Sequence, residues 1–196
     1  PEGEQEIFSL DEMIKIWDPA RISKSPAIFD PLKLRAINAA YIRALPAEEF
    51  RKLADSFIDQ AVHVQIDRDL LCANLQPRCE VLEDIPPQLD FFDAVLPIDA
   101  EMYRNKKQKT TPESAKEALS ALLPVLEAQT DWSRDAIFEA CKQKAEAMEK
   151  KNGWLLFPLG IALSGKARTP GGGTDLAAMM GKEETLRRLN AAIEAL

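Results

Sequence analysis

Histidine, cysteine and long apolar runs are scarce in this chain of 196 residues. His63 is the only histidine, so a metal site built on a histidine pair is excluded, and we expect a structural or surface role for it. No uninterrupted apolar stretch approaches the roughly 20 residues of a membrane helix. Three cysteines without a C-x-x-C pair predict buried free thiols in a reducing compartment: Cys72, Cys79 and Cys141.

An excess of basic residues is also missing. The chain has 25 Lys and Arg against 32 Asp and Glu, a formal net charge of −7. This balance argues against nonspecific nucleic-acid binding, although a locally basic patch on an acidic protein still permits a specific RNA contact. The acidic stretch Pro1–Glu6 is not a signal peptide, and the absent initiator Met predicts a piece of a longer protein. We expect a cytoplasmic location.

Helical signals, in contrast, are frequent. Ser9–Glu12 is a capping box, and Asp30-Pro31 pairs an N-cap with a proline at the first helical position. Apolar side chains then follow at helical spacing on one face, ended by Pro46: Leu34, Ile37, Tyr41 and Leu45. Further helical stretches are predicted over 47–60, 66–85 with a break at Pro77, 112–123, 133–151, 154–163, 175–180 and 182–195. Without an alternating strand pattern, an all-α fold is favoured.

Two segments look like connectors. The first runs from Pro97 to Thr111 and contains the one strongly basic run, Arg104–Lys109. That run fits either a solvated loop or a contact with an RNA backbone. The second, 166–173, is a glycine-rich loop by composition. Asn152-Gly153 is the expected stop signal of the predicted helix over 133–151.

One short stretch raises the question of an ATP site. Arg21–Ser25 resembles the KMSKS loop that class I aminoacyl-tRNA synthetases close over ATP. The sequence has no strand–loop–helix unit with a phosphate-binding glycine pattern, and Ala167 occupies the Ser/Thr position that would follow Gly160–Gly165 and Lys166. We therefore expect no ATP site in this chain and interpret Lys24-Ser25 as structural.

Four stretches in sequence order carry a family resemblance. Phe29–Arg43 is similar to the pattern F-D-x-x-K-L-x-x-x-N-x-x-Y-I-R. The other three are 76–82 with Phe91-Phe92 beyond it, 158–165 and 181–189, which are similar to R-x-x-x-L, P-L-R-x-A-L-[ST]-G and G-K-E-x-x-L-x-R-[IL]. Each motif is weak alone, but together they cover nearly the whole chain. The chain resembles bacterial glutamyl-tRNA synthetases.

This resemblance implies an all-α, multi-helix anticodon-binding region at the C-terminal side of a glutamate–tRNA ligase. Residues 1–45 would end the stem-contact region, and 46–96 and 97–196 would form two helical subdomains. The chain would hold no catalytic residue, cofactor or metal, because ATP and Mg would bind in a catalytic part that this sequence does not contain. The implied partner is the anticodon loop of tRNA(Glu), bound by a monomer without membrane contact.

Arg78 is the main site residue that the resemblance implies. The family arginine at this position reads the third anticodon base, a C in glutamate tRNAs and a G in glutamine tRNAs. Because Arg78 follows Pro77, it would lie in the first turn of a restarted helix, where a cation is mildly unfavourable. An outward reach to RNA by its planar guanidinium would explain that choice. The alternative is a surface ion pair with Glu80 or Glu83.

Gly160 departs from the family pattern, in which many relatives carry an arginine that contacts the anticodon loop. Lys166, Arg168 and Thr169-Pro170 follow in the next loop, and the family's T-P pair lies close to the anticodon bases. These residues are candidates to take over part of the contact. Alternatively, Gly160 marks a divergent paralogue with an altered preference between tRNA(Glu) and tRNA(Gln).

Aromatic candidates for stacking on unpaired bases are Tyr103, Trp154 and Phe157, of which we expect the last two in the core. A function from a different class also stays open. The net charge fits a helical protein-interaction module that uses this scaffold without binding RNA.

Overall fold

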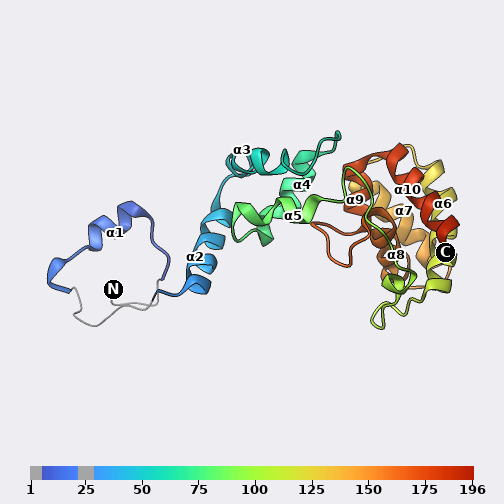
Figure 1. The fold of residues 1–196 in the computed structure, drawn as a ribbon, viewed down its shortest axis with the longest axis horizontal. Coiled ribbons are helices and arrows are strands. Elements are labelled where there is room, and N and C mark those ends of the chain that lie inside the picture. The colour runs from blue at the N-terminus through green and yellow to red at the C-terminus, as the bar shows by residue number, and fades with distance from the viewer. Residues whose placement is uncertain (1–5, 22–28) are drawn as a thin grey trace.

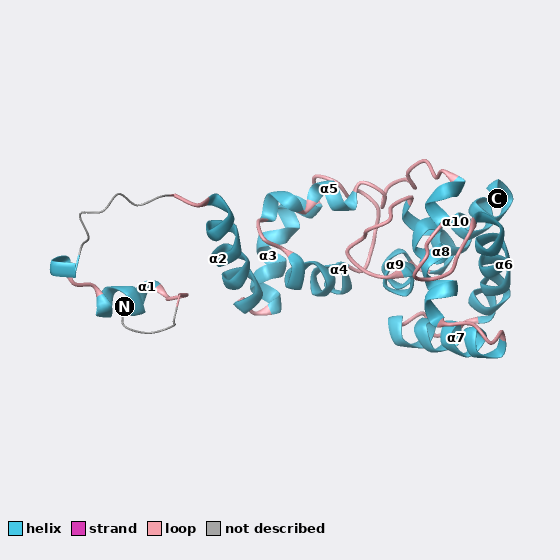
Figure 2. Ribbon diagram, turned by 90° about the horizontal axis from the view of Figure 1, so that it is seen from below, coloured by secondary structure: helices cyan, strands magenta, loops and turns pink. Residues whose placement is uncertain are grey.

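A computed structural model describes residues 6–21 and 29–196, and Figure 1 shows an elongated arrangement of helices. All regular elements in the described ranges are helical, apart from one isolated β-bridge, as expected for an all-α fold (Figure 2). The α-helices are α1 (Leu10–Ile16), α2 (Pro31–Ala44), α3 (Ala47–Ile58), α4 (Arg68–Leu75), α5 (Pro86–Leu89), α6 (Pro112–Ala128), α7 (Arg134–Ala147), α8 (Asn152–Ser164), α9 (Gly173–Met180) and α10 (Lys182–Ala195).

Local capping sets several helix starts. The predicted Ser9 capping box is present, and the Asp30 side chain accepts hydrogen bonds from the backbone N–H groups of the first turn of α2. The predicted apolar face of α2 is only partly right, because Leu34 and Tyr41 are exposed while Ala39 and Ile42 are buried. Most of the KMSKS-like stretch lies outside the described residues, so the structural interpretation of its Lys and Ser stays a prediction.

The middle part of the chain contains short elements. Helix α4 leads directly into a 3₁₀ turn, Gln76–Arg78, and a second 3₁₀ turn, Leu82–Asp84, precedes α5. The amide of Gln76 donates hydrogen bonds to the carbonyl oxygens of Ile42 and Leu45, at 3.0 and 2.8 Å, which fixes this turn against the end of α2. The helix therefore does not restart after Pro77, and Arg78 ends a turn instead of beginning one.

The C-terminal helices form a bundle around α8, which contacts α6, α7, α9 and α10. The predicted boundary between α7 and α8 is wrong. Helix α7 ends at Ala147, and Asn152 and Gly153 begin α8 instead of ending α7. Glu149 adopts the left-handed conformation at φ 54°, and the Lys150 N–H donates to the carbonyl of Ala145. A non-glycine residue thus makes the reversal, which no glycine rule predicts.

Gly165 ends α8 as expected, at φ 69°. A Cβ atom there would lie 2.5 Å from the Leu96 carbonyl oxygen. Gly165→Ala should therefore lower the free energy of unfolding by about 2–4 kcal/mol, from backbone strain plus overpacking. Gly160→Ala is the control, because Gly160 lies inside α8 and an added Cβ would be 3.8 Å from the Gly173 nitrogen, so neither backbone strain nor overpacking applies there. Equal losses in urea unfolding would contradict the close approach.

Arg188 joins the middle part of the chain to the bundle. Its side chain is buried, and its terminal nitrogens donate to the carbonyl oxygens of Phe91, Phe92 and Leu163, each at 2.7 Å. Its Nε donates to Glu184 Oε1 at 2.5 Å. A buried cation is tolerated when its donors are satisfied, and these bonds meet that condition.

The same contacts predict a pH dependence of stability. Hydrogen bonds from Arg187, and then from Arg188, lower the pKa of Glu184 from 4.5 to about 2. Between these values the unfolded chain binds more protons than the folded one, so this contribution is complete above about pH 4.5 and is lost toward pH 2. In unfolding experiments between pH 5 and 2, Glu184→Gln should lose less stability than the unsubstituted chain. The exposed Glu183, replaced by Gln, is the control, and equal pH slopes for both variants would contradict the assignment.

Candidate nucleic-acid interface

A cavity of about 650 Å³ lies between the turn after α4 and the surface formed by α8 and the 166–173 loop. Its lining includes five of the six residues singled out from the sequence: Arg78, Gly160, Lys166, Arg168 and Thr169. The sixth, Pro170, is buried in the loop and does not line the cavity. Residues far apart in the sequence are thus brought to one concave surface.

Arg78 is exposed at the end of the 3₁₀ turn and has no ion-pair partner among the residues that the structure describes. The alternative pairing with Glu80 or Glu83 is wrong, because Glu80 instead accepts a hydrogen bond from Arg35 at 3.0 Å. The predicted position of Arg78 at an unfavourable helix start is also wrong, because Arg78 ends the 3₁₀ turn, where a cation is favourable. Arg78 therefore places a guanidinium against the cavity, without an ion-pair partner in the described part of the chain.

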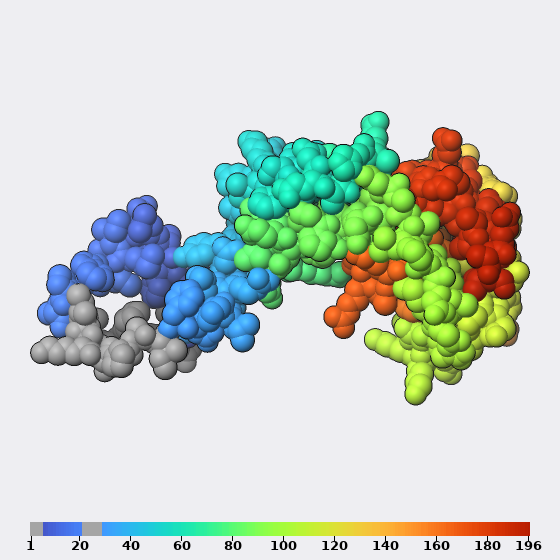
Figure 3. Space-filling view, viewed as in Figure 1, coloured from blue at the N-terminus to red at the C-terminus, as the bar shows by residue number. Residues whose placement is uncertain are grey.

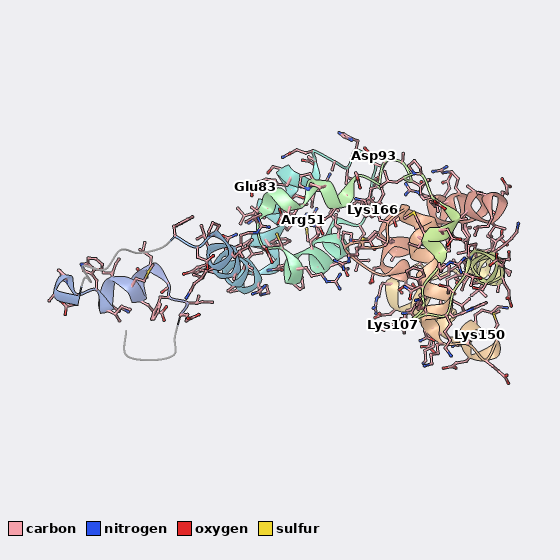
Figure 4. The ribbon with its side chains drawn as sticks, turned by 60° about the horizontal axis from the view of Figure 1, so that its bottom comes forward. Arg51, Glu83, Asp93, Lys107, Lys150 and Lys166 are labelled. Atoms are coloured by element: carbon pink, nitrogen blue, oxygen red, sulfur yellow. The ribbon has the colours of Figure 1, made fainter. Side chains whose placement is uncertain are left out.

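The loop residues differ in what they offer to a ligand. Lys166 Nζ donates to the Pro87 carbonyl at 2.8 Å and pairs with Asp90, so Lys166 ties the loop to the α5 region (Figure 4). Thr169 donates its hydroxyl hydrogen to the Gly171 carbonyl at 2.6 Å. Arg168 is exposed and, within the described ranges, makes no side-chain ion pair or hydrogen bond. Arg168 is therefore the loop's available cation.

Gly160 lies where α8 meets the start of α9. A Cβ on Gly173 would come within 2.8 Å of the Leu156 carbonyl oxygen and 3.0 Å of the Gly160 nitrogen, so the two helices cross closely there. A Cβ on Gly160 itself would lie 3.8 Å from the Gly173 nitrogen, which is an ordinary contact. Packing therefore does not require glycine at position 160.

The structure changes which aromatic side chains are available to stack on a base. Tyr103 is 1% exposed, so stacking by Tyr103 is ruled out, and burial raises its pKa to about 12. Its hydroxyl has no hydrogen-bond partner among the residues that the structure describes. Trp154 lies in the core as predicted, but Phe157, also predicted in the core, is half-buried and lines the cavity. Gln88 and Leu156 also line the cavity, although neither was predicted from the sequence. The position of Leu156, one turn before Gly160, was the available signal.

The remaining candidate residues are the three cysteines and the single histidine. The three cysteines are free and buried as predicted, and burial raises the pKa of Cys72 and Cys79 to about 11 and that of Cys141 to about 12. His63 is exposed, with Nδ1 2.5 Å from Asp93 Oδ2. Across 6–21 and 29–196, no three His, Cys, Asp or Glu side chains are grouped to hold a metal ion. In the same ranges no helix has the length and apolarity to cross a membrane.

Known proteins with similar sequences indicate the family of this chain. The family described as an anticodon binding domain matches residues 33–193. The glutamate–tRNA ligase of Clostridium botulinum (strain Hall) is 42% identical over all 196 residues, which are 40% of that protein. The ligase of Clostridium acetobutylicum is 43% identical over 197 aligned positions, 41% of its length. The chain thus spans about two fifths of the curated relatives that it matches.

Solved structures agree with the fold. A glutamate tRNA ligase from Elizabethkingia meningosepticum, in complex with its amino acid, superposes with a TM-score of 0.80 at 27% identity, over 98% of this chain and 38% of that one. A glutamate–tRNA synthetase from Elizabethkingia anophelis gives 0.76 at 27% identity, over 97% and 37%. The all-α fold and the sequence resemblance are confirmed. The chain belongs to the anticodon binding domain family and corresponds to the anticodon-binding part of glutamate–tRNA ligases.

Proposed function

We propose that the cavity binds the anticodon loop of tRNA(Glu). The observation that carries this proposal is the convergence of two exposed arginines, Arg78 and Arg168, on a cavity that is also lined by the half-buried Phe157. Neither arginine makes an ion pair with the residues that the structure describes. Bases of single-stranded loops are recognised by stacking and by hydrogen bonds to their edges. Phe157 offers a stacking surface, and each guanidinium offers two parallel donors to a base or phosphate.

The proposed roles differ among the predicted residues. Arg78 reads the third anticodon base, and Arg168 contacts the neighbouring bases or phosphates. Lys166, Thr169 and Pro170 hold the loop in place, because their groups are engaged or buried within the protein. Gly160 leaves its part of the wall open, which suits either a relaxed reading of the other bases or a divergent paralogue with an altered preference between tRNA(Glu) and tRNA(Gln).

For the whole protein we propose a cytoplasmic, monomeric glutamate–tRNA ligase that activates glutamate with ATP and Mg in a part outside this chain. The division into 1–45, 46–96 and 97–196 stays part of this proposal. Residues 1–45 would contact the tRNA stem, and the other two parts would share the anticodon cavity.

Loop-dependent binding tests the proposal. The chain is titrated, over a series of salt concentrations, with the tRNA(Glu) anticodon stem-loop and with the same stem closed by an unrelated short loop. We expect at least tenfold weaker binding to the second RNA, and a log–log salt dependence for both, since phosphate contacts release counterions. Equal affinities would refute anticodon recognition. Absence of salt-dependent binding, also with full-length tRNA, would favour the protein-interaction module.

A further inference from the structure

Five exposed lysines from two distant segments form what we call the lysine patch: Lys106, Lys107, Lys109, Lys150 and Lys151. Within the ranges that the structure describes, none of them makes an ion pair. Lys150 Nζ lies 5.0 Å from the centre of the Trp154 ring. Figure 4 shows Lys107 and Lys150 on the same side of the molecule. Lysines without an ion-pair partner in the described residues thus lie on one side of a protein with net charge −7.

The first segment is an ordered hairpin. Asn105 and Thr110 exchange two backbone hydrogen bonds at 3.1 Å, and the Asn105 side chain accepts from the N–H groups of Lys107 and Gln108 at 2.9 and 3.1 Å. Lys109 adopts φ 57°, a conformation that costs a non-glycine residue energy unless its surroundings impose it. The hairpin thus presents its exposed lysines in a defined arrangement.

The hairpin packs on the helix that lines the cavity. A Cβ on Gly153 would overlap the Gln108 side chain, 1.8 Å from its Oε1, so Gln108 lies directly against the start of α8. Gly153, Leu156, Phe157 and Gly160 follow at spacings of three and four, which puts them on one face of α8. The last three line the cavity, and the helical rise puts Gly153 about 6 Å before Phe157 along the axis. The lysine patch therefore borders the cavity.

The surface beside the hairpin and the N-terminal end of α8 support the same placement of the lysine patch. The hairpin and the 166–172 loop both project from the lower side of the space-filling view (Figure 3). The N-cap residue of α8, Lys151, makes no side-chain capping bond, so the positive end of the α8 dipole adds to the field of the lysines. Arg104, the remaining cation of the basic run, is already paired with Glu101.

We propose that the lysine patch binds the phosphates of the RNA strand that continues from the bases held in the cavity. This inference rests on the proposed function and extends it from base reading to backbone binding. Contacts of this kind fix the position of a nucleic acid and add affinity, but they do not distinguish bases. The basic hairpin, open to two interpretations from the sequence alone, is thereby assigned to the RNA backbone.

The test removes one lysine from each segment, in the full 196-residue chain. Lys107→Gln/Lys151→Gln is compared with Lys52→Gln/Lys116→Gln, which removes the same charge from exposed positions on α3 and α6 that line neither the cavity nor the patch. The probes are two anticodon stem-loops with C or G at the third anticodon position. We expect the first variant to weaken both complexes by the same factor, about 3–10-fold at low salt, and to reduce the log–log salt slope by roughly 1–2.

Failure of this inference is distinguishable from failure of the proposed function. The inference is overturned when both double variants share the salt slope of the unsubstituted chain, or when loss of the lysines changes the ratio of C to G binding. Arg78→Gln, measured in parallel, reports on base reading through the ratio of C to G binding, so its result can uphold the proposed function while the patch fails. An unsubstituted chain that binds neither stem-loop at the lowest salt overturns both.

Discussion

Replacing Arg188 by Met is expected to lower the free energy of unfolding by about 3–5 kcal/mol. The substitution roughly keeps the apolar volume of the side chain but removes every donor. The carbonyl oxygens of Phe91, Phe92 and Leu163 then lose the partner that they share at 2.7 Å. Unsatisfied buried acceptors cost about 1–3 kcal/mol each, although the costs of neighbours need not add. Guanidinium chloride unfolding monitored by circular dichroism measures the loss.

The adjacent arginine supplies the control. Arg187 also binds Glu184, at 2.7 Å, but 61% of its side chain is exposed. Arg187→Met should therefore cost less than about 1 kcal/mol, as expected for a surface ion pair. Arg188→Lys should fall between the two, because an ammonium group cannot reach all three carbonyls with the geometry of a guanidinium. Similar losses for the two methionine variants would show that Arg188 does not hold the middle part of the chain against the bundle.

Replacing Arg78 by Gln is expected to weaken binding of the C-containing stem-loop by about 1–3 kcal/mol, which is about 5–150-fold. Because the side chain is exposed and makes no ion pair in the described part of the chain, stability should change by less than about 0.5 kcal/mol. Fluorescence anisotropy with labelled stem-loops measures the first quantity, and urea unfolding measures the second.

Arg168→Gln distinguishes the reading of a base from electrostatic attraction to the phosphates. Both substitutions remove one exposed cation from the same cavity, so both should reduce the salt slope by a similar amount. Only the Arg78 substitution should relax the choice between C and G at the third position. If the Arg168 substitution relaxes that choice equally, the base assignment of Arg78 is wrong.

Helix starts were the most predictable part of the fold. The side chains of Ser9, Asp30, Thr111 and Ser133 each accept a hydrogen bond from the first turn of the helix that follows, a local interaction that a short stretch of sequence fully encodes. The end of α7 was not predictable in this way. The left-handed residue there is Glu149, whereas the Asn-Gly pair that resembles a stop signal begins the next helix.

The site was predictable as a group of residues more than as a set of contacts. The family resemblance placed Arg78 and the 160–169 residues together, and one cavity contains them. Tertiary packing decided which groups are available. The engagement of Lys166 with Pro87 and Asp90, and the burial of Tyr103, depend on segments distant in the sequence. No periodicity or composition within the loop indicates these partners.

The central claim is that this cavity reads the anticodon through Arg78. Its most direct test is a set of four dissociation constants, for the unsubstituted chain and Arg78→Gln with the C and G stem-loops, at one stated low salt concentration. The account predicts a clear preference of the unsubstituted chain for C and nearly equal affinities for Arg78→Gln. The same preference in both proteins would contradict the claim, because base choice would then be made elsewhere.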